Sequence, residues 1–175
     1  GLKNSGSVAL DTAGNISFAA NQTSNSAGAF DNGGTVTLSA SDISFTGNKS
    51  ASGYGGAIFN AGDLNITGAQ NTFQGNIAND TGATKSGGGA IHNRGNTGTA
   101  TLVIGDADSI NRFDSNSSGA YGGAIVARAF DGSGQDSDIT INGSTYFNKN
   151  TSTLDGGAIW NYVSSSGGTT GTSTI

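Results

Sequence analysis

The string Gly-Gly-Ala-Ile recurs along this chain, and its regular spacing constrains the fold more than any other feature. The four copies begin at Gly55, Gly88, Gly122 and Gly156, so they are 33, 34 and 34 residues apart. A variant copy, Ala27-Gly28-Ala29-Phe30, begins 28 residues before the first. A fixed period of this size is typical of a repeat protein in which each repeat forms one supersecondary unit.

A second motif, Phe-x-x-Asn, alternates with the first. Between the two motifs lies a pair of apolar residues spaced by two, which is the period of a strand with one buried face. Each repeat therefore has three short extended segments in a fixed order, and the insertions fall in the turns. The Phe-x-x-Asn copies span 18–21, 45–48, 73–76, 113–116 and 147–150, and the apolar pairs are Val8/Leu10, Val36/Leu38, Leu64/Ile66, Leu102/Ile104 and Ile139/Ile141.

These repeats predict an all-β fold, a parallel β-helix of about five coils with 28–34 residues and three strands in each coil. Insertions that vary from coil to coil favour the right-handed form over the left-handed form, which follows a hexapeptide period. We expect residues 1–175 to form a single solenoid, either as a segment of a longer chain or as an open-ended subunit.

Equivalent residues of successive coils are expected to stack as ladders. We predict an inward aliphatic ladder, a ladder of offset-stacked rings, and a ladder of asparagine side chains that hydrogen-bond from coil to coil. A second asparagine column follows Gly-Gly-Ala-Ile and is interrupted by Ala127. The predicted ladders are Ile58, Ile91, Ile125 and Ile159; Phe18, Phe45, Phe73, Phe113 and Phe147; Asn21, Asn48, Asn76, Asn116 and Asn150; and Asn32, Asn60, Asn93 and Asn161.

Composition excludes several classes of protein. The net charge is −5 with only seven lysines and arginines, which argues against a nucleic-acid partner because phosphate binding needs a basic face. The chain has no cysteine, so it forms neither disulfides nor cysteine metal sites. No apolar run is long enough to be a transmembrane helix.

The alternation of Gly-Gly-Ala-Ile with Phe-x-x-Asn across residues 18–161 resembles the repeats of the chlamydial polymorphic outer membrane proteins. That resemblance implies the passenger of an autotransporter, which is a β-helix displayed at the bacterial cell surface and used in adhesion. It therefore implies an extracellular location, with a host-surface protein or a glycan as the partner.

The position directly after the isoleucine of Gly-Gly-Ala-Ile is expected to face outward. In the four intact copies it holds Phe59, His92, Val126 and Trp160. We predict that these residues form an exposed stripe that stacks on sugar rings or contacts a protein partner. His92, the only histidine, is expected to face solvent. The competing interpretation is that a loop near Ala129-Phe130 covers the stripe.

No catalytic arrangement is evident, since the aspartates near the strands occupy different positions in their coils. We therefore expect a non-enzymatic protein. Calcium is the one cofactor that the sequence raises, because alternate aspartates offer oxygen ligands, although Asp beside Gly or Ser is more often part of a turn. The candidate calcium ligands are Asp106 with Asp108, and Asp131 with Asp136 and Asp138.

The alternative function is a self-assembling fibre subunit, since open β-helix ends expose unpaired backbone.

Overall fold

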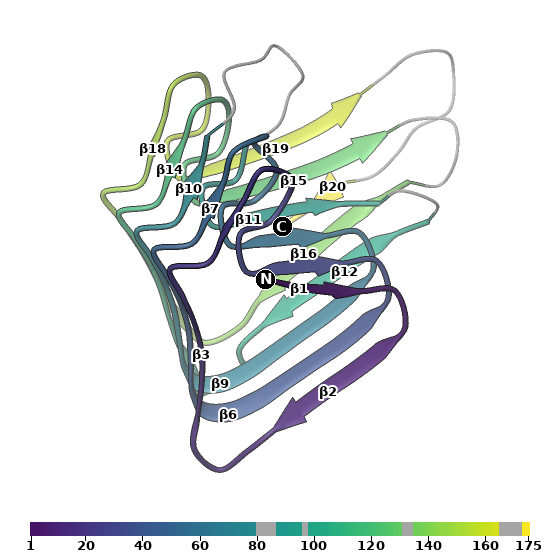
Figure 1. Ribbon diagram of the computed structural model, residues 1–175, viewed down its shortest axis with the longest axis vertical. Coiled ribbons are helices and arrows are strands. Elements are labelled where there is room, and N and C mark those ends of the chain that lie inside the picture. The colour runs from purple at the N-terminus through teal and green to yellow at the C-terminus, as the bar shows by residue number, and fades with distance from the viewer. Residues whose placement is uncertain (80–86, 96–97, 131–134, 165–172) are drawn as a thin grey trace.

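The structure is a computed structural model that describes residues 1–79, 87–95, 98–130, 135–164 and 173–175. Every regular element in these ranges is a β-strand, and the strands of successive coils pair in parallel. Figure 1 shows the coils stacked on one another around a common core, with three walls in cross-section. The predicted parallel β-helix is confirmed. Within the described ranges no helix is present that could cross a membrane.

The Gly-Gly-Ala-Ile segments build the first wall, which we call wall A. Their isoleucines pair in register from coil to coil, and Phe30 holds the equivalent place in the variant copy. Ile58, Ile91 and Ile125 are fully buried, and Ile159 packs against the core from its edge, so the aliphatic ladder is confirmed. The strands of wall A are β1 (Leu2–Asn4), β5 (Phe30–Asn32), β8 (Ile58–Asn60), β11 (Ile91–Arg94), β15 (Ile125–Phe130) and β19 (Ile159–Ser164).

One sheet bends around a corner and forms the other two walls, so that β2 and β3 lie along different sides of the cross-section (Figure 1). The apolar pairs build wall B and the Phe-x-x-Asn segments build wall C, and two long strands run through both. The strands are β2 (Ser7–Asp11), β3 (Asn15–Ala19), β6 (Thr35–Thr46), β9 (Asp63–Gln74), β12 (Ala100–Ile104), β13 (Ile110–Asp114), β16 (Ser137–Ile141), β17 (Ser144–Asn148) and β20 (Ser173–Thr174).

A small sheet of two-residue strands follows the Asn of each Phe-x-x-Asn motif, at the corner between walls C and A. The sequence does not predict these strands, because two residues carry no detectable period. They are β4 (Gln22–Thr23), β7 (Lys49–Ser50), β10 (Ile77–Ala78), β14 (Ser117–Ser118) and β18 (Thr151–Ser152).

The aromatic ladder is confirmed on the inner side of wall C. Successive rings from Phe18 to Phe147 lie 4.6–5.1 Å apart between centroids, with interplanar angles of 2–12°. Phe45, Phe73 and Phe113 are fully buried, whereas Phe147 at the end of the stack is 36% exposed. Each inner ring therefore has a neighbour on both faces.

The asparagine ladder is also confirmed, and it runs in one direction. Each side-chain Nδ2 donates to the Oδ1 of the next coil at 2.9–3.0 Å, from Asn21 through to Asn150. The same Oδ1 accepts the preceding asparagine's backbone N–H, as Asn76 does from Asn48. These bonds satisfy buried polar groups at a corner where the strand pairing of the walls is interrupted.

Candidate functional site

The outer face of wall A gathers three of the chain's four tyrosines, its only tryptophan and two of its three arginines. Strand register arranges the residues of the strands in two columns, one directly after the ladder isoleucines and one two residues further on. Tyr54 and Tyr121 come from the turns just ahead of the strands. The first column is Phe59, His92, Val126 and Trp160, and the second is Arg94, Arg128 and Tyr162.

The prediction of an exposed stripe is wrong for three of its four residues. Val126 and His92 are fully buried and Phe59 is 8% exposed, while Trp160 is half-buried. The outward direction was predicted correctly, but side chains from the turns cover the face. Tyr54 packs on it, with its ring centroid 5.8 Å from that of Phe59 and 5.1 Å from that of His92.

Arg94 completes this cover over the second and third coils. Its guanidinium carbon lies 5.2 Å from the ring centroid of Tyr54 and 5.4 Å from that of Phe59. Such cation–π contacts strengthen when water is excluded. The preceding coil has Ala61 directly after its ladder asparagine, where the third coil has Arg94, so a small side chain leaves room for the guanidinium to lie across the two rings.

His92 is a buried imidazole in this outer layer, which corrects the expectation that it faces solvent. Its Nδ1 lies 3.2 Å from the carbonyl oxygen of Gly87. Because a carbonyl only accepts, Nδ1 carries the proton, and the buried Nε2 has no hydrogen-bond partner. Burial, and secondarily the positive charge of Arg94, lower the pKa of His92 from 6.5 to about 3.

Trp160 lies in a stack of three rings at the other end of the layer. The ring centroid of Tyr121 is 4.1 Å from that of Trp160 at 19°, and that of Tyr162 is 4.7 Å away at 6°. Tyr121 precedes the strands of wall A and Tyr162 follows Trp160 along β19, so a phenol ring lies against each face of the indole. Trp160 therefore offers its edge, not a free face, to a partner.

Arg94 and Arg128 lie in register on neighbouring strands. Both follow a ladder isoleucine by three residues. Arg128 is 8% exposed, and burial together with the charge of Arg94 lowers its pKa. The shared offset from the motif is the signal that predicts this pairing.

Wall A also widens toward the later coils. Its strands have three residues in β1, β5 and β8, four in β11, and six in β15 and β19. The number of residues between a strand of wall A and the next strand of wall B rises in parallel, from two after β5 and β8 to five, six and eight after β11, β15 and β19. Insertions on one face of a solenoid often mark its binding face.

The candidate calcium ligands are used or dispersed in the structure. Asp106 Oδ1 accepts hydrogen bonds from the backbone N–H of Asp108 and from Ser109 Oγ, which is the chemistry of a tight turn. Asp138 lies in β16, Asp136 in the preceding turn, and Asp131 outside the described residues. Across the described ranges no three histidine or aspartate side chains gather to hold a metal ion.

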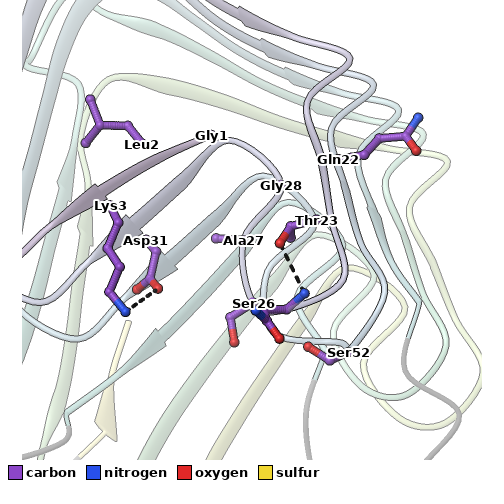
Figure 2. A pocket seen from close by; sticks show the side chains of 11 residues that line it. Gly1, Leu2, Lys3, Gln22, Thr23, Ser26, Ala27, Gly28, Asp31 and Ser52 are labelled. Atoms are coloured by element: carbon purple, nitrogen blue, oxygen red, sulfur yellow. Dashed lines mark hydrogen bonds and ion pairs between the residues drawn. The ribbon is translucent and has the colours of Figure 1, made fainter.

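A hollow of about 460 Å³ lies at the N-terminal end of the solenoid, between β1 and the turn that follows β4 (Figure 2). Small and polar residues such as Thr23, Ser26 and Ser52 line it. Its two charged side chains, Lys3 and Asp31, form an ion pair at 3.8 Å. None of the predicted binding residues or calcium ligands lines this hollow.

Comparison with known proteins agrees with this geometry. The model of the Chlamydia polymorphic membrane protein repeat matches residues 42–61, 72–94 and 144–162. The chain carries polymorphic membrane protein repeats. It is also 36% identical over 146 residues to the probable autotransporter YfaL of Escherichia coli strain K12. The alignment covers 76% of this chain and 11% of YfaL, and no solved structure matches the chain.

Each segment that matches the polymorphic membrane protein repeat runs from wall C through the corner into wall A. The three matched segments contain Phe59, His92 and Trp160, together with Tyr54 and Arg94. The resemblance predicted from the two motifs is confirmed, and the chain is a β-helix module of a surface protein. The family model and the autotransporter relative both point to a location at the outer membrane or the cell surface.

Proposed function

We propose that this β-helix is an adhesive module that binds a host-surface molecule through the outer face of wall A. The single observation that carries the proposal is the gathering of aromatic and arginine side chains on one wall, whose strands lengthen from three residues to six along the solenoid. Tryptophan, tyrosine and arginine are the residues most enriched at binding hot spots. The proposal involves no catalytic step and no cofactor.

The packing of the rings favours a protein partner over a glycan on this wall. Sugar binding by an aromatic residue uses a free ring face, and both faces of Trp160 are covered by tyrosines. The edges of the stack and the half-buried Arg94 suit the mixed apolar and polar contacts of a protein interface.

The test is attachment of the purified module to host cells. Replacing Tyr121 and Tyr162 with alanine removes the outer rings of the stack and leaves the inner ladders unchanged. We expect attachment to weaken about 30-fold, the loss typical of a hot-spot residue worth about 2 kcal/mol. The matched control is Thr35→Ala with Thr37→Ala on wall B, which should attach normally. Equal attachment by both variants, each with a wild-type circular dichroism spectrum, would exclude wall A.

Treatment of the host cells identifies the class of partner. Mild proteolysis of the cell surface should abolish attachment, whereas enzymatic removal of glycans should leave most of it. The opposite pattern would assign the site to a glycan.

A fibre subunit is the second candidate, and one observation favours it. The ring of Phe147 stacks on Phe113 with one face and is 36% exposed, so another coil could continue the stack. That coil could come from a second copy or from the same longer chain. Sedimentation and electron microscopy separate the two: rods that lengthen with concentration support a fibre, and monomers at high concentration exclude it.

A further inference from the structure

His92 is an ionisable group buried on the outside of the β-helix, and the proposed adhesive function does not use it. The ring has no exposed surface, and its Nε2 lacks a hydrogen-bond partner. Buried polar atoms without partners are rare in native proteins. A proton added to the Nε2 of His92 would therefore place a positive charge on a buried atom that has no hydrogen-bond partner.

The imidazole forms a hydrogen bond to Gly87, which lies directly before the Gly-Gly-Ala-Ile segment of β11. Its Nδ1 donates to the carbonyl oxygen of Gly87. Gly87 in turn forms parallel bridges to Tyr54 and Tyr121, the two tyrosines that cover the outer face. The backbone N–H of Gly87 also donates to Gly53 at 2.7 Å. The position of both tyrosines therefore depends on the residue that His92 holds.

Within the part of the chain that the structure describes, the charges that act on the ring oppose a proton on it. Arg94 on its own strand and Arg128 on the neighbouring strand both act on the imidazole as positive charges. Tyr54, from the turn ahead of β8, and Phe59, on β8, cover it as neutral rings. A protonated His92 would be a third cation in a layer from which water is excluded, where like charges repel strongly.

We propose that His92 is an acid-operated latch for the outer layer of wall A. When the ring is protonated, Tyr54, Phe59 and Arg94 separate and the segment around Gly87 is released, so that the outer face becomes accessible. The inner ladders stay closed, because they consist of phenylalanine, isoleucine and asparagine, none of which titrates. This inference is independent of which partner wall A binds.

The pH window follows from the two states of the ring. Burial in the closed layer lowers the pKa of His92 from 6.5 to about 3, so between these values only the open layer binds the proton. Each pH unit below 6.5 then shifts the equilibrium about tenfold toward the open layer, or about 100-fold between pH 7.5 and pH 4.5. His92 is the only histidine and every acidic residue is aspartate, so no other side chain has its ordinary pKa between pH 4.5 and pH 7.5.

Amide hydrogen exchange on the full chain tests the latch. Protection factors, corrected for the intrinsic effect of pH, would be compared at pH 7.5 and pH 4.5 for residues 87–95 and for residues 70–76 of wall C. We expect the protection of residues 87–95 to fall up to about 100-fold, and that of residues 70–76 to stay within twofold. NMR of the single imidazole should show no titration of the closed form near pH 6.5.

The control variant is His92→Asn, whose side-chain amide still donates to Gly87 but does not titrate. Its protection at residues 87–95 should be the same at both pH values. Three results would overturn the proposal: unchanged protection in the wild type, an equal loss in His92→Asn, or titration of His92 near 6.5 while the layer stays protected.

Discussion

Asn93 donates its side-chain Nδ2 to the hydroxyl oxygen of Ser137, which lies 44 residues further along the chain, at 3.0 Å. In the preceding coils the same donor binds the next asparagine, as Asn60 does to Asn93 at 2.7 Å. The fourth coil has Ala127 at this place, and Ser137 at the start of wall B supplies the missing oxygen. Ser137 also donates back to the carbonyl of Asn93.

A double-mutant cycle at this break is the first prediction. Ser137→Ala should lower the free energy of unfolding by about 1–2 kcal/mol, because buried groups of Asn93 lose a partner. Ala127→Asn should also lower the free energy of unfolding, because the new amide would compete for the buried place that the hydroxyl of Ser137 already fills. In the double variant the new amide replaces that hydroxyl, so we expect at least about 1 kcal/mol of favourable coupling in urea unfolding. If the losses of the two single variants simply add in the double variant, Ser137 does not take the place of the asparagine that is missing at position 127.

The aromatic ladder predicts a dependence on position. Phe73→Ala should cost about 3–5 kcal/mol, because it empties a fully buried site between two stacked rings. Phe147→Ala, at the exposed end of the same stack, should cost less than half as much. Chemical denaturation of the two variants measures the difference. Equal losses would mean that the ladder is not the stack described.

Two glycines should respond in opposite ways to substitution. A Cβ at Gly56 would lie 2.0 Å from the carbonyl oxygen of Gly89, so Gly56→Ala should prevent close stacking of the coils and unfold the protein. Gly75 has a φ of +62° with open space around it, and Ser115 and Lys149 occupy the equivalent place with φ of 55° and 51°. Gly75→Ser should therefore remain folded and lose only about 1 kcal/mol. Circular dichroism and thermal melting of both variants check the contrast.

Global stability should also depend on His92. Its pKa in the folded chain, about 3, is below the unfolded value of 6.5, so the unfolded chain binds more protons in between. Stability is therefore complete above pH 6.5 and declines as the pH falls toward 3, by about 2 kcal/mol at pH 5 relative to pH 7.5. Urea midpoints at the two pH values measure the loss, and His92→Asn should abolish it. A pH dependence retained in that variant would place its origin elsewhere.

The inner architecture was predictable because stacking repeats the same chemistry in every coil. Each ladder residue stands at a fixed place in a motif, so Phe73 or Asn76 could be assigned from the sequence with its neighbours. Ser137 could not, because it belongs to a different wall and shares no motif with the asparagine that it replaces. Strand β1 was also missed, since only Asn4 of Leu2–Asn4 matches the motif of wall A.

The sequence predicts that the side chains on the outer face of wall A point outward, but it does not predict that most of them are buried. Alternation along a strand shows that His92 points away from the core, but it says nothing about what arrives from the turns. The cover comes from Tyr54 and from Arg94, which lie at different distances from the motif. The presence of tyrosine directly before Gly-Gly in two copies, Tyr54 and Tyr121, is the signal that would have indicated it.

The most direct test of an adhesive wall A uses the absence of cysteine from the chain. Single cysteines can carry a bulky polymer at three places: Ala61→Cys beside the outer layer of wall A, in the turn directly after β8, Thr35→Cys on wall B and Thr46→Cys on wall C. We predict that the polymer at position 61 abolishes attachment to host cells, and that the polymers at 35 and 46 leave it unchanged. Attachment that survives the label at 61 and is lost with the label at 35 or 46 would contradict the account.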